Sequence, residues 1–219
     1  MTERMLVDLV ADPVCPWCFV GIWSYHKTLP ALASDFEVVT RYRPYLLNPD
    51  TPDAGVDRHA HYRKKFPDSK KLGAMREVLK SAAREIGVDF DPAGPPWLPN
   101  TLKAHQLIRW AHFEGKQTDV VLSIYRAYWR DGADIGDIDT LGAIAAAAQM
   151  DADAIKSRLV AGKDAKSVRG EAVAFANAGV SGVPTFIVNE RTGFSGGMPP
   201  AKLEAALRHA AETTANTNS

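Results

Sequence analysis

Two cysteines separated by two residues are the side chains of this sequence best suited to chemistry. They lie in the segment Cys15-Pro16-Trp17-Cys18, and the 219-residue chain has no other cysteine. A thiol pair at this spacing can close and reopen a disulfide. In a reducing compartment it indicates redox chemistry or metal binding rather than a structural disulfide framework.

The segments around the cysteine pair predict how it is held. The apolar run Met5–Val10 is typical of an inner strand. The next element begins at Pro16, and apolar residues recur at mostly helical intervals from Cys18 through Ala33, with Pro30 expected to break or kink the end. Both sulfurs then lie on the first turn of a helix that follows a strand. This spacing brings their Cα atoms to about the separation that a disulfide needs.

The two thiols are predicted to differ in reactivity. Cys15 lies at the N-terminal end of the helix, where free backbone N–H groups and the helix dipole lower a thiol pKa from about 8.5 to roughly 3.5–7.5. Cys18 lies one turn further in and is expected to be more buried, with a higher pKa. We therefore assign Cys15 as the attacking nucleophile and Cys18 as the thiol that resolves a mixed disulfide.

Two other roles for the cysteine pair are less well supported. A structural zinc site needs four ligands, so either His59 with His61 or His105 with His112 would have to complete it. His59 and His61 are two residues apart in a predicted helix and would point away from each other. A permanent disulfide between such close positions removes little entropy from the unfolded chain. No metal is therefore expected.

Composition and charge argue against several other classes of function. The chain is 46% hydrophobic and 24% charged, which is ordinary for a globular protein. Its 26 Lys and Arg balance 26 Asp and Glu without a long basic stretch, so no nucleic-acid partner is expected. No window approaches the roughly 18 consecutive apolar residues of a membrane span, and no signal-peptide pattern is visible. We predict a cytoplasmic protein without a membrane partner.

The rest of the sequence predicts one sheet with a helical insertion. A second strand is expected over Glu37–Leu47, and residues 51–174 have no strand signal. Helical patterns fill that block, most of them opening near an Asp or Thr that can cap the first turn. The helices are expected over Asp57–Phe66, Asp68–Ile86, Thr101–Glu114, Thr118–Arg130, Asp139–Gln149, Asp151–Val160 and Lys163–Ala178.

Strand signals return near the C-terminus, over Val183–Asn189 and Phe194–Gly197, before a closing helix from Pro200 to about Thr213. Neither outer part has enough strands for a sheet of its own, so the two are expected to share one. The prediction is an α/β fold in which residues 1–50 and 175–213 form one unit. Residues 51–174 form an inserted helical subdomain, and residues 214–219 form a disordered tail.

Taken together, these motifs resemble the DsbA family of thioredoxin-fold oxidoreductases, specifically its cytoplasmic FrnE-like branch. The resemblance implies a thioredoxin fold with a large all-helical insertion. It spans nearly the whole chain. The segments that carry it are Asp12-Pro13 with the cysteine motif, Val183-Pro184-Thr185-Phe186, Arg43–Pro49, Asn100-Thr101 with Ala104-His105, and Ser195-Gly196-Gly197.

The resemblance also implies roles for residues outside the cysteine pair. In this family the proline that matches Pro184 is cis and faces the cysteines, and Val183 offers backbone groups to an extended substrate segment. Pro16 and Trp17 would tune the redox properties of the pair. Periplasmic members have Pro-His between the cysteines, so Trp17 leaves no imidazolium beside the nucleophile.

Several further residues are weaker candidates. Asn48 and Trp97 are assigned to substrate binding. Trp97, Trp110 and Trp129 could line a groove, although aromatic residues at helical spacing are more often core. Asp12 could relay protons to the resolving thiol or could cap a turn. His105 is more simply interpreted as a packed helix residue.

The predicted function is thiol–disulfide exchange with protein or low-molecular-weight thiol substrates. Electrons pass through the cysteine pair itself, so no bound cofactor is needed, and glutathione or another small thiol is the candidate co-substrate. The alternative is a glutathione-dependent transferase or isomerase of small aromatic compounds. Kappa-class transferases and 2-hydroxychromene-2-carboxylate isomerases share the insertion architecture but typically have serine at the position of Cys15. A third alternative is a non-catalytic binding module.

Overall fold

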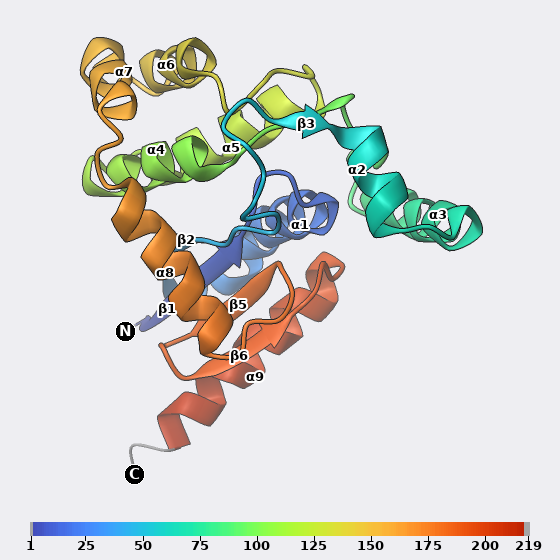
Figure 1. Cartoon of the computed structure of the whole chain (residues 1–219). Helices are drawn as coiled ribbons and strands as arrows, with labels where there is room; N and C mark the ends of the chain where they lie inside the picture. The colour runs from blue at the N-terminus through green and yellow to red at the C-terminus, as the bar shows by residue number, and fades with distance from the viewer. Residues whose placement is uncertain (1, 217–219) are drawn as a thin grey trace.

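The computed structural model describes residues 2–216 and has a mixed sheet at its centre (Figure 1). The strand order is β2-β1-β5-β6, and β1 pairs parallel with β2 and antiparallel with β5. Segments from both ends of the chain therefore share one sheet, as predicted. The strands are β1 (Glu3–Ala11), β2 (Phe36–Pro44), β5 (Thr185–Val188) and β6 (Thr192–Ser195).

Strand β1 lies between β2 and β5, and its side chains are buried over most of its length. Met5, Val7 and Leu9 are fully buried, and so is Val10 on the other side of the strand. Such continuous burial is typical of a strand covered on both faces. Helices α1 (Pro16–Leu32) and α9 (Pro200–Asn216) contact each other, while helices of the insertion contact β2.

The helical insertion follows the predicted order, and each of its main helices has ends within two residues of the expected ones. Asp57, Asp68, Asp137 and Asp151 each accept a hydrogen bond from a backbone N–H of the first turn, which explains this agreement. The limits of the subdomain at residues 51 and 174 stay predictions. The helices are α2 (Arg58–Lys65), α3 (Ser69–Glu85), α4 (Leu102–Phe113), α5 (Gln117–Trp129), α6 (Ile138–Ala147), α7 (Ala152–Val160) and α8 (Ala165–Asn177).

Two short strands inside the insertion were not predicted. β3 (Val56–Asp57) pairs antiparallel with β4 (Trp97–Leu98). Two residues are too few to produce a recognisable alternation, so the statement that residues 51–174 lack strands is wrong at these positions. The pair brings the start of α2 to the proline-rich loop before α4.

The remaining differences concern the ends of elements. Asn189 and Glu190 have positive φ and turn the chain directly after β5, so β6 begins two residues earlier than predicted. Helix α1 includes Pro30 and ends two residues after it. Helix α9 continues to Asn216, so the first residues of the expected disordered tail are helical, and residues 217–219 lie outside the described residues.

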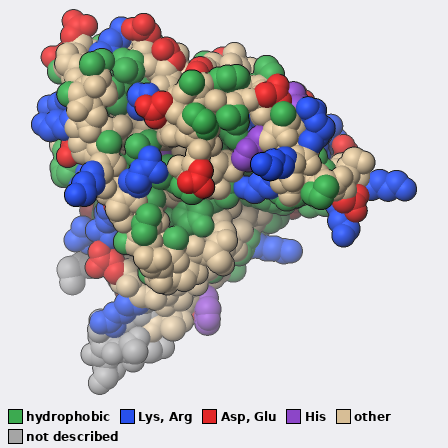
Figure 2. Space-filling view, viewed as in Figure 1, with side chains coloured by type: hydrophobic (Ala, Val, Ile, Leu, Met, Phe, Trp, Pro, Cys, Tyr) green, Lys and Arg blue, Asp and Glu red, His purple; other side chains and the backbone are tan. Residues whose placement is uncertain are grey.

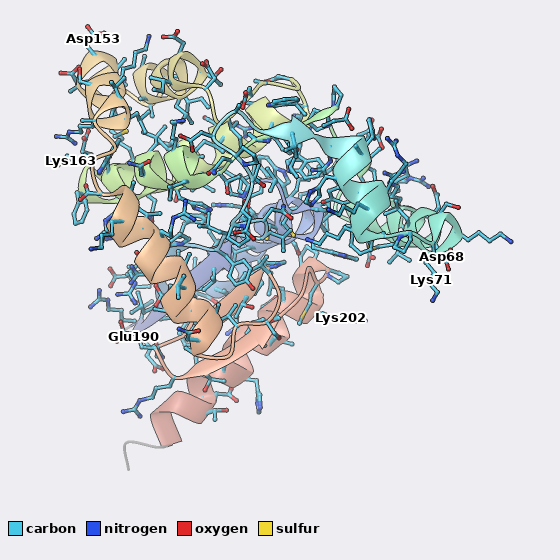
Figure 3. The ribbon with its side chains drawn as sticks, in the orientation of Figure 1. Asp68, Lys71, Asp153, Lys163, Glu190 and Lys202 are labelled. Carbon is cyan, nitrogen blue, oxygen red and sulfur yellow. The ribbon has the colours of Figure 1, made fainter. Side chains whose placement is uncertain are left out.

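Charge is unevenly distributed over the surface. Residues 57–85 contain nine Lys and Arg against four Asp and Glu. Lys, Arg and His side chains gather over α2 and α3 at the right of the space-filling view (Figure 2). Figure 3 labels Lys71 at this end and Asp153 of α7 at the opposite end. The insertion therefore presents a basic end formed by α2 and α3.

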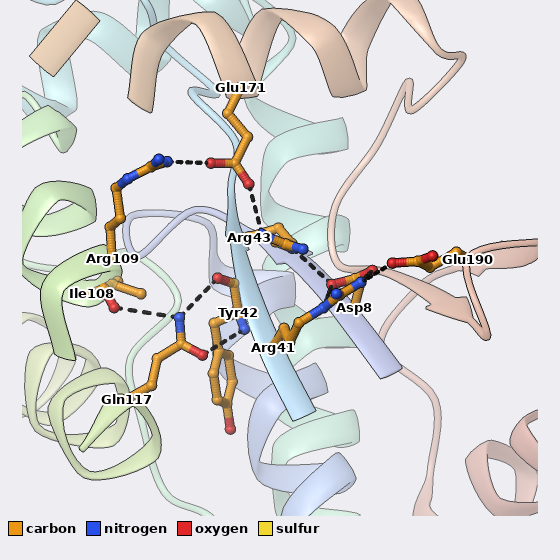
Figure 4. A network of polar contacts seen from close by, with 9 residues as sticks. All are labelled: Asp8, Arg41, Tyr42, Arg43, Ile108, Arg109, Gln117, Glu171 and Glu190. Carbon is orange, nitrogen blue, oxygen red and sulfur yellow. Dashed lines mark hydrogen bonds and ion pairs between the residues drawn. The ribbon is translucent and has the colours of Figure 1, made fainter. Parts of the chain in front are cut away.

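An ion network joins the sheet to the insertion (Figure 4). Asp8, which is 5% exposed, accepts hydrogen bonds of 2.7 Å from the Nε atoms of both Arg41 and Arg43. Arg43 also contacts Glu171 at 3.1 Å, and Arg109 contacts the same carboxylate at 2.9 Å. Because the central carboxylate is buried, its two arginine partners stabilise a charge that would otherwise be costly.

Candidate active site

The cysteine motif lies where strand β1 passes into helix α1, as predicted. Cys15 is the N-cap residue and Pro16 is the first residue of the helix, where its missing N–H and restricted φ cost nothing. The N–H groups of Cys18 and Phe19 both donate to the Cys15 carbonyl at 3.1 Å and begin the helix. The Cys15 sulfur therefore lies at the end of the helix that carries the free N–H groups.

The pKa values of the two thiols shift in opposite directions. The hydrogen bond from the Cys18 thiol lowers the pKa of Cys15, and the backbone N–H groups of Cys18 and Trp17 add to this effect against the opposing effect of burial. Burial raises the pKa of Cys18 well above its usual value, and the neighbouring Cys15 raises it further. These are the directions expected of a nucleophile and a resolving thiol.

In the reduced protein, Cys15 is expected to react with iodoacetamide at least about tenfold faster than Cys18 at mildly acidic pH, because only the thiolate attacks. Peptide mapping by mass spectrometry over a time course measures both rates in one sample. The variants Cys15→Ser and Cys18→Ser are the controls for each thiol alone. Equal labelling of the two positions would contradict the assignment.

The segment before β5 lies against the cysteine pair. The Cys15 Sγ atom is 3.6 Å from the Val183 carbonyl oxygen. The Val183–Pro184 bond is cis, which confirms the cis proline that the family resemblance implies. Pro184 also packs against α1 at Gly21, where a Cβ atom would lie 2.6 Å from its Cγ atom. Only glycine permits this approach, so Gly21 is part of the arrangement that brings these distant segments together.

A groove of about 350 Å³ adjoins this contact. The Trp17 side chain forms one wall, and a Cβ atom at Gly197 would lie only 3.1 Å from its ring. The groove thus combines the residue between the cysteines with the segments on both sides of the β5–β6 hairpin. Its lining residues are Trp17, Gly182, Val183, Ser195, Gly196 and Gly197.

Two of the predicted substrate-binding residues lie away from that groove. Asn48 is in the turn after β2, where its Oδ1 atom lies 3.1 Å from both His61 Nε2 and Lys65 Nζ. Trp97, which is 39% exposed, lies on β4 and is not among the residues that line the groove. Trp110 and Trp129 are both buried, so the interpretation of these two as core residues is confirmed.

Asp12 is a buried carboxyl group beside the cysteines. It accepts hydrogen bonds from the Leu47 N–H at 2.7 Å and the Val14 N–H at 3.3 Å, yet burial raises its pKa to about 6. A negative charge on Asp12 raises the pKa of both Cys15 and Cys18. The protons on these three groups are therefore coupled.

A buried arginine supports the loop before Cys15, and the sequence analysis missed it. Arg58 is 1% exposed and lies over the rings of Tyr62 and Trp129, at 4.4 and 4.9 Å from their centroids. It donates to the Tyr128 hydroxyl at 2.9 Å. Trp129 in turn donates from Nε1 to the Pro13 carbonyl at 2.8 Å. One arginine among many in a basic helix gives no sequence signal of burial.

Replacing Arg58 by alanine is expected to lower the free energy of unfolding by about 3 kcal/mol, because the aromatic rings lose their central contact and a cavity remains. Urea unfolding followed by tryptophan fluorescence measures the loss. Arg63→Ala changes the same charge on an exposed position of the same helix and is expected to cost under about 0.5 kcal/mol. Equal losses would show that Arg58 does not support the fold in this way.

The histidines do not complete a metal site with the cysteines. His105 is buried with Nε2 3.0 Å from the Tyr45 carbonyl oxygen, and burial lowers its pKa to about 4. It is a neutral, packed residue, as expected. Among residues 2–216, no group of three or more His, Cys, Asp or Glu side chains could hold a metal ion.

The helices within the same residues include none with the length and apolar composition of a membrane span.

The family of this chain follows from comparison with known proteins. The family model described as a DSBA-like thioredoxin domain matches residues 6–208. The chain belongs to the DSBA-like thioredoxin domain family. A solved structure of a probable DsbA oxidoreductase from Streptomyces coelicolor is 26% identical, with a TM-score of 0.81. The match covers 94% of this chain and 89% of that one.

Two more distant solved structures share the fold. A 2-hydroxychromene-2-carboxylate isomerase is 18% identical with a TM-score of 0.68, and the match covers 98% of this chain and 100% of that one. The cytosolic disulfide reductase DsbM from Pseudomonas aeruginosa, solved with GSH, is 16% identical with a TM-score of 0.63 over 93% and 99% of the two chains. At these identities the likeness shows the architecture and not the reaction.

Proposed function

We propose that this DSBA-like protein is a thiol–disulfide oxidoreductase of the FrnE-like branch that acts on protein or low-molecular-weight thiol substrates. The observation that carries the proposal is the placement of both thiols at the start of helix α1, with the Cys15 Sγ atom 3.6 Å from the Val183 carbonyl oxygen that precedes the cis Pro184. Cys15 has a lowered pKa and Cys18 a raised one, at the start of one helix. The neighbouring family member from Streptomyces coelicolor, named as a probable DsbA oxidoreductase, supports it.

The proposed reaction proceeds by two sulfur exchanges. The Cys15 thiolate attacks one sulfur of a substrate disulfide, forms a mixed disulfide and releases the other sulfur as a thiolate. Cys18 then loses its proton and attacks the Cys15 sulfur, which releases the second substrate thiolate. The substrate gains two electrons and the cysteine pair becomes a disulfide. The same steps in reverse oxidise a dithiol.

The proton of Cys18 needs an acceptor within the buried site. Asp12 has a pKa raised to about 6, and its charge is coupled to that of Cys18. A carboxylate with such a pKa can take up a proton near neutral pH and return it later. We assign Asp12 this relay. Val183 and the groove beside Trp17 are assigned to the substrate backbone, because an extended segment lying there would meet Cys15 at its sulfur.

Glutathione or another small thiol is the proposed co-substrate that regenerates the pair. The DsbM structure solved with GSH supports this choice, since that protein shares the fold. The reaction itself needs no bound cofactor, because both electrons reside on the two sulfurs. A cytoplasmic location and action without a membrane partner stay predictions.

A redox titration against glutathione tests the proposal. We expect the Cys15–Cys18 pair to equilibrate between about −270 mV, the thioredoxin value, and about −120 mV, the DsbA value, because no imidazolium lies between the cysteines. Quantifying free thiols by alkylation and mass spectrometry at each glutathione ratio gives the potential. The Cys15→Ser variant is the control. A pair that never forms an intramolecular disulfide at any ratio would rule out the proposed function.

A further inference from the structure

A second pocket shares no lining residue with the groove beside Trp17. It has a volume of about 520 Å³ and lies between the turn after β2 and helix α2. The turn contributes both apolar and polar side chains, and helix α2 contributes one histidine and two lysines. The lining residues are Leu47, Asn48, Pro49, Asp50, Thr51, Pro52, Val56, His61, Lys64 and Lys65.

The charged groups of this pocket favour an anion. Lys64 and Lys65 both line it, and Asp50 is the one carboxylate among its lining residues. The positive charges of Lys65, Arg58 and Lys64 add to burial in lowering the pKa of His61. The lowered pKa favours the neutral form of His61, in which the ring is a polar group without charge. Helix α2, which supplies the histidine and both lysines of the pocket, belongs to the basic end of the insertion.

Backbone contacts connect this pocket to the nucleophile. Leu47, a lining residue, donates its N–H to the Asp12 carboxylate at 2.7 Å. The Asp12 carbonyl in turn accepts the N–H of Cys15 at 3.0 Å. The charge of Lys65 also reaches the site, where it lowers the pKa of Asp12 against the larger effect of burial. A ligand held in the pocket therefore lies beside the residues that position Cys15.

We propose that this pocket binds a carboxylate of an anionic low-molecular-weight thiol or disulfide, through Lys64 and Lys65, while the sulfur of that molecule reacts at Cys15. The apolar wall formed by Leu47, Pro52 and Val56 suits the carbon chain between the carboxylate and the sulfur. This inference rests on the proposed function and names the class of co-substrate that it uses.

Reduction of the cysteine pair by a small thiol takes two sulfur exchanges. A first thiolate attacks Cys15 of the Cys15–Cys18 disulfide, forms a mixed disulfide and releases Cys18 as a thiolate, which takes up a proton. A second thiolate attacks the sulfur of the bound small molecule and releases Cys15 as a thiolate. Two small thiols are oxidised to one disulfide, and the cysteine pair gains two electrons. A carboxylate anchor speeds the first attack by holding the reacting sulfur near Cys15.

The test compares three thiols of different charge as reductants of the oxidised full-length protein. Glutathione is anionic, 2-mercaptoethanol is neutral and cysteamine is cationic. Stopped-flow tryptophan fluorescence gives each second-order rate, corrected for the thiolate fraction of the reductant. In the double variant Lys64→Gln/Lys65→Gln, we expect the ratio of the glutathione rate to the 2-mercaptoethanol rate to fall about tenfold. The ratio of the cysteamine rate to the 2-mercaptoethanol rate should rise.

Matched variants separate the pocket from general electrostatics. Lys70→Gln/Lys71→Gln removes the same charge from exposed positions of α3 that do not line the pocket. In this variant the ratio of the glutathione rate to the 2-mercaptoethanol rate should stay within about twofold of its value in the unmodified protein. Asp50→Asn removes the carboxylate of the pocket and should raise the ratio. An unchanged ratio in the Lys64/Lys65 variant, or an equal fall in the Lys70/Lys71 variant, would overturn the inference.

The outcome also distinguishes this inference from the proposed function. If none of the three thiols reduces the pair in the unmodified protein, the proposed function fails. If all three reduce it in proportion to their thiolate concentration alone, the cysteine pair is redox active and only the anion pocket fails. If the Lys64/Lys65 variant loses rate with an acidic peptide dithiol as the reductant but not with glutathione, the pocket serves macromolecules and the inference is wrong.

Discussion

Replacing Cys18 by serine is expected to convert the protein into a trap that keeps its substrate covalently bound to Cys15. Without the second thiol, attack by Cys15 still forms a mixed disulfide, but nothing resolves it from within. Catalytic turnover of a peptide disulfide should fall at least about 100-fold, or about 2.7 kcal/mol in activation free energy. The adducts should be released by dithiothreitol and identified by mass spectrometry after non-reducing electrophoresis.

The matching variant Cys15→Ser is expected to form no adduct, because Cys18 is fully buried and has a raised pKa. The same pair of variants separates the proposed reaction from its alternative. A glutathione-dependent transferase or isomerase needs no resolving thiol, so Cys18→Ser would keep turnover of an aromatic substrate with glutathione and would trap no protein. That result would reject disulfide exchange as the function.

Replacing Asp12 by asparagine is expected to stabilise the protein by about 2–3 kcal/mol at neutral pH. The pKa of Asp12 is raised to about 6 in the folded state, above the value of about 3.9 expected for an unfolded chain. The folded state therefore holds a proton that the unfolded state releases between these values. The contribution of this group to stability is fully present below about pH 4 and is lost as the pH rises through about 6.

Asparagine cannot ionise, and its oxygen can still accept the Leu47 N–H, while its NH2 group gives up only the longer contact of 3.3 Å with the Val14 N–H. The gain should therefore disappear at acidic pH. Urea unfolding of the reduced protein, with and without Asp12→Asn, measures the difference across this range. Asp8→Asn is the matched control, because Asp8 is a buried carboxylate on strand β1, which ends directly before Asp12. Asp8 is buried between Arg41 and Arg43, and removing its charge should lower the stability at neutral pH. A loss of stability in both variants would show that the ionised Asp12 carboxylate does not destabilise the folded state at neutral pH.

The parts of the site that the sequence predicts are those held by local structure. The strand, the helix and the position of Cys15 at the helix start follow from a run of 30 residues, and proline at the first helical position marks the boundary. The contact between Cys15 and Val183 joins residues 168 positions apart, and it was expected only through the family resemblance.

The parts that the sequence does not predict depend on where separate elements meet. Arg58 is buried only because Tyr62, Tyr128 and Trp129 surround it, and the last two lie on another helix. Charged residues are usually exposed, so the residue type alone predicts an exposed position for Arg58, whereas the structure buries it. Asn48 and Trp97 were assigned to substrate binding, but the structure separates both from the groove beside Trp17, and that role stays a prediction.

The insertion between β2 and β5 has a consequence for how the protein is made. Strand β1 needs both neighbours, but 140 residues separate Pro44 at the end of β2 from Thr185 at the start of β5. At roughly 5–20 residues per second on the ribosome, β1 and β2 wait about 7–28 s for that partner. The helices of the insertion rely on contacts closer in sequence and have time to fold first. During this interval one edge of β1 stays open in the nascent chain, so translation speed and chaperone binding bear directly on the yield of active protein.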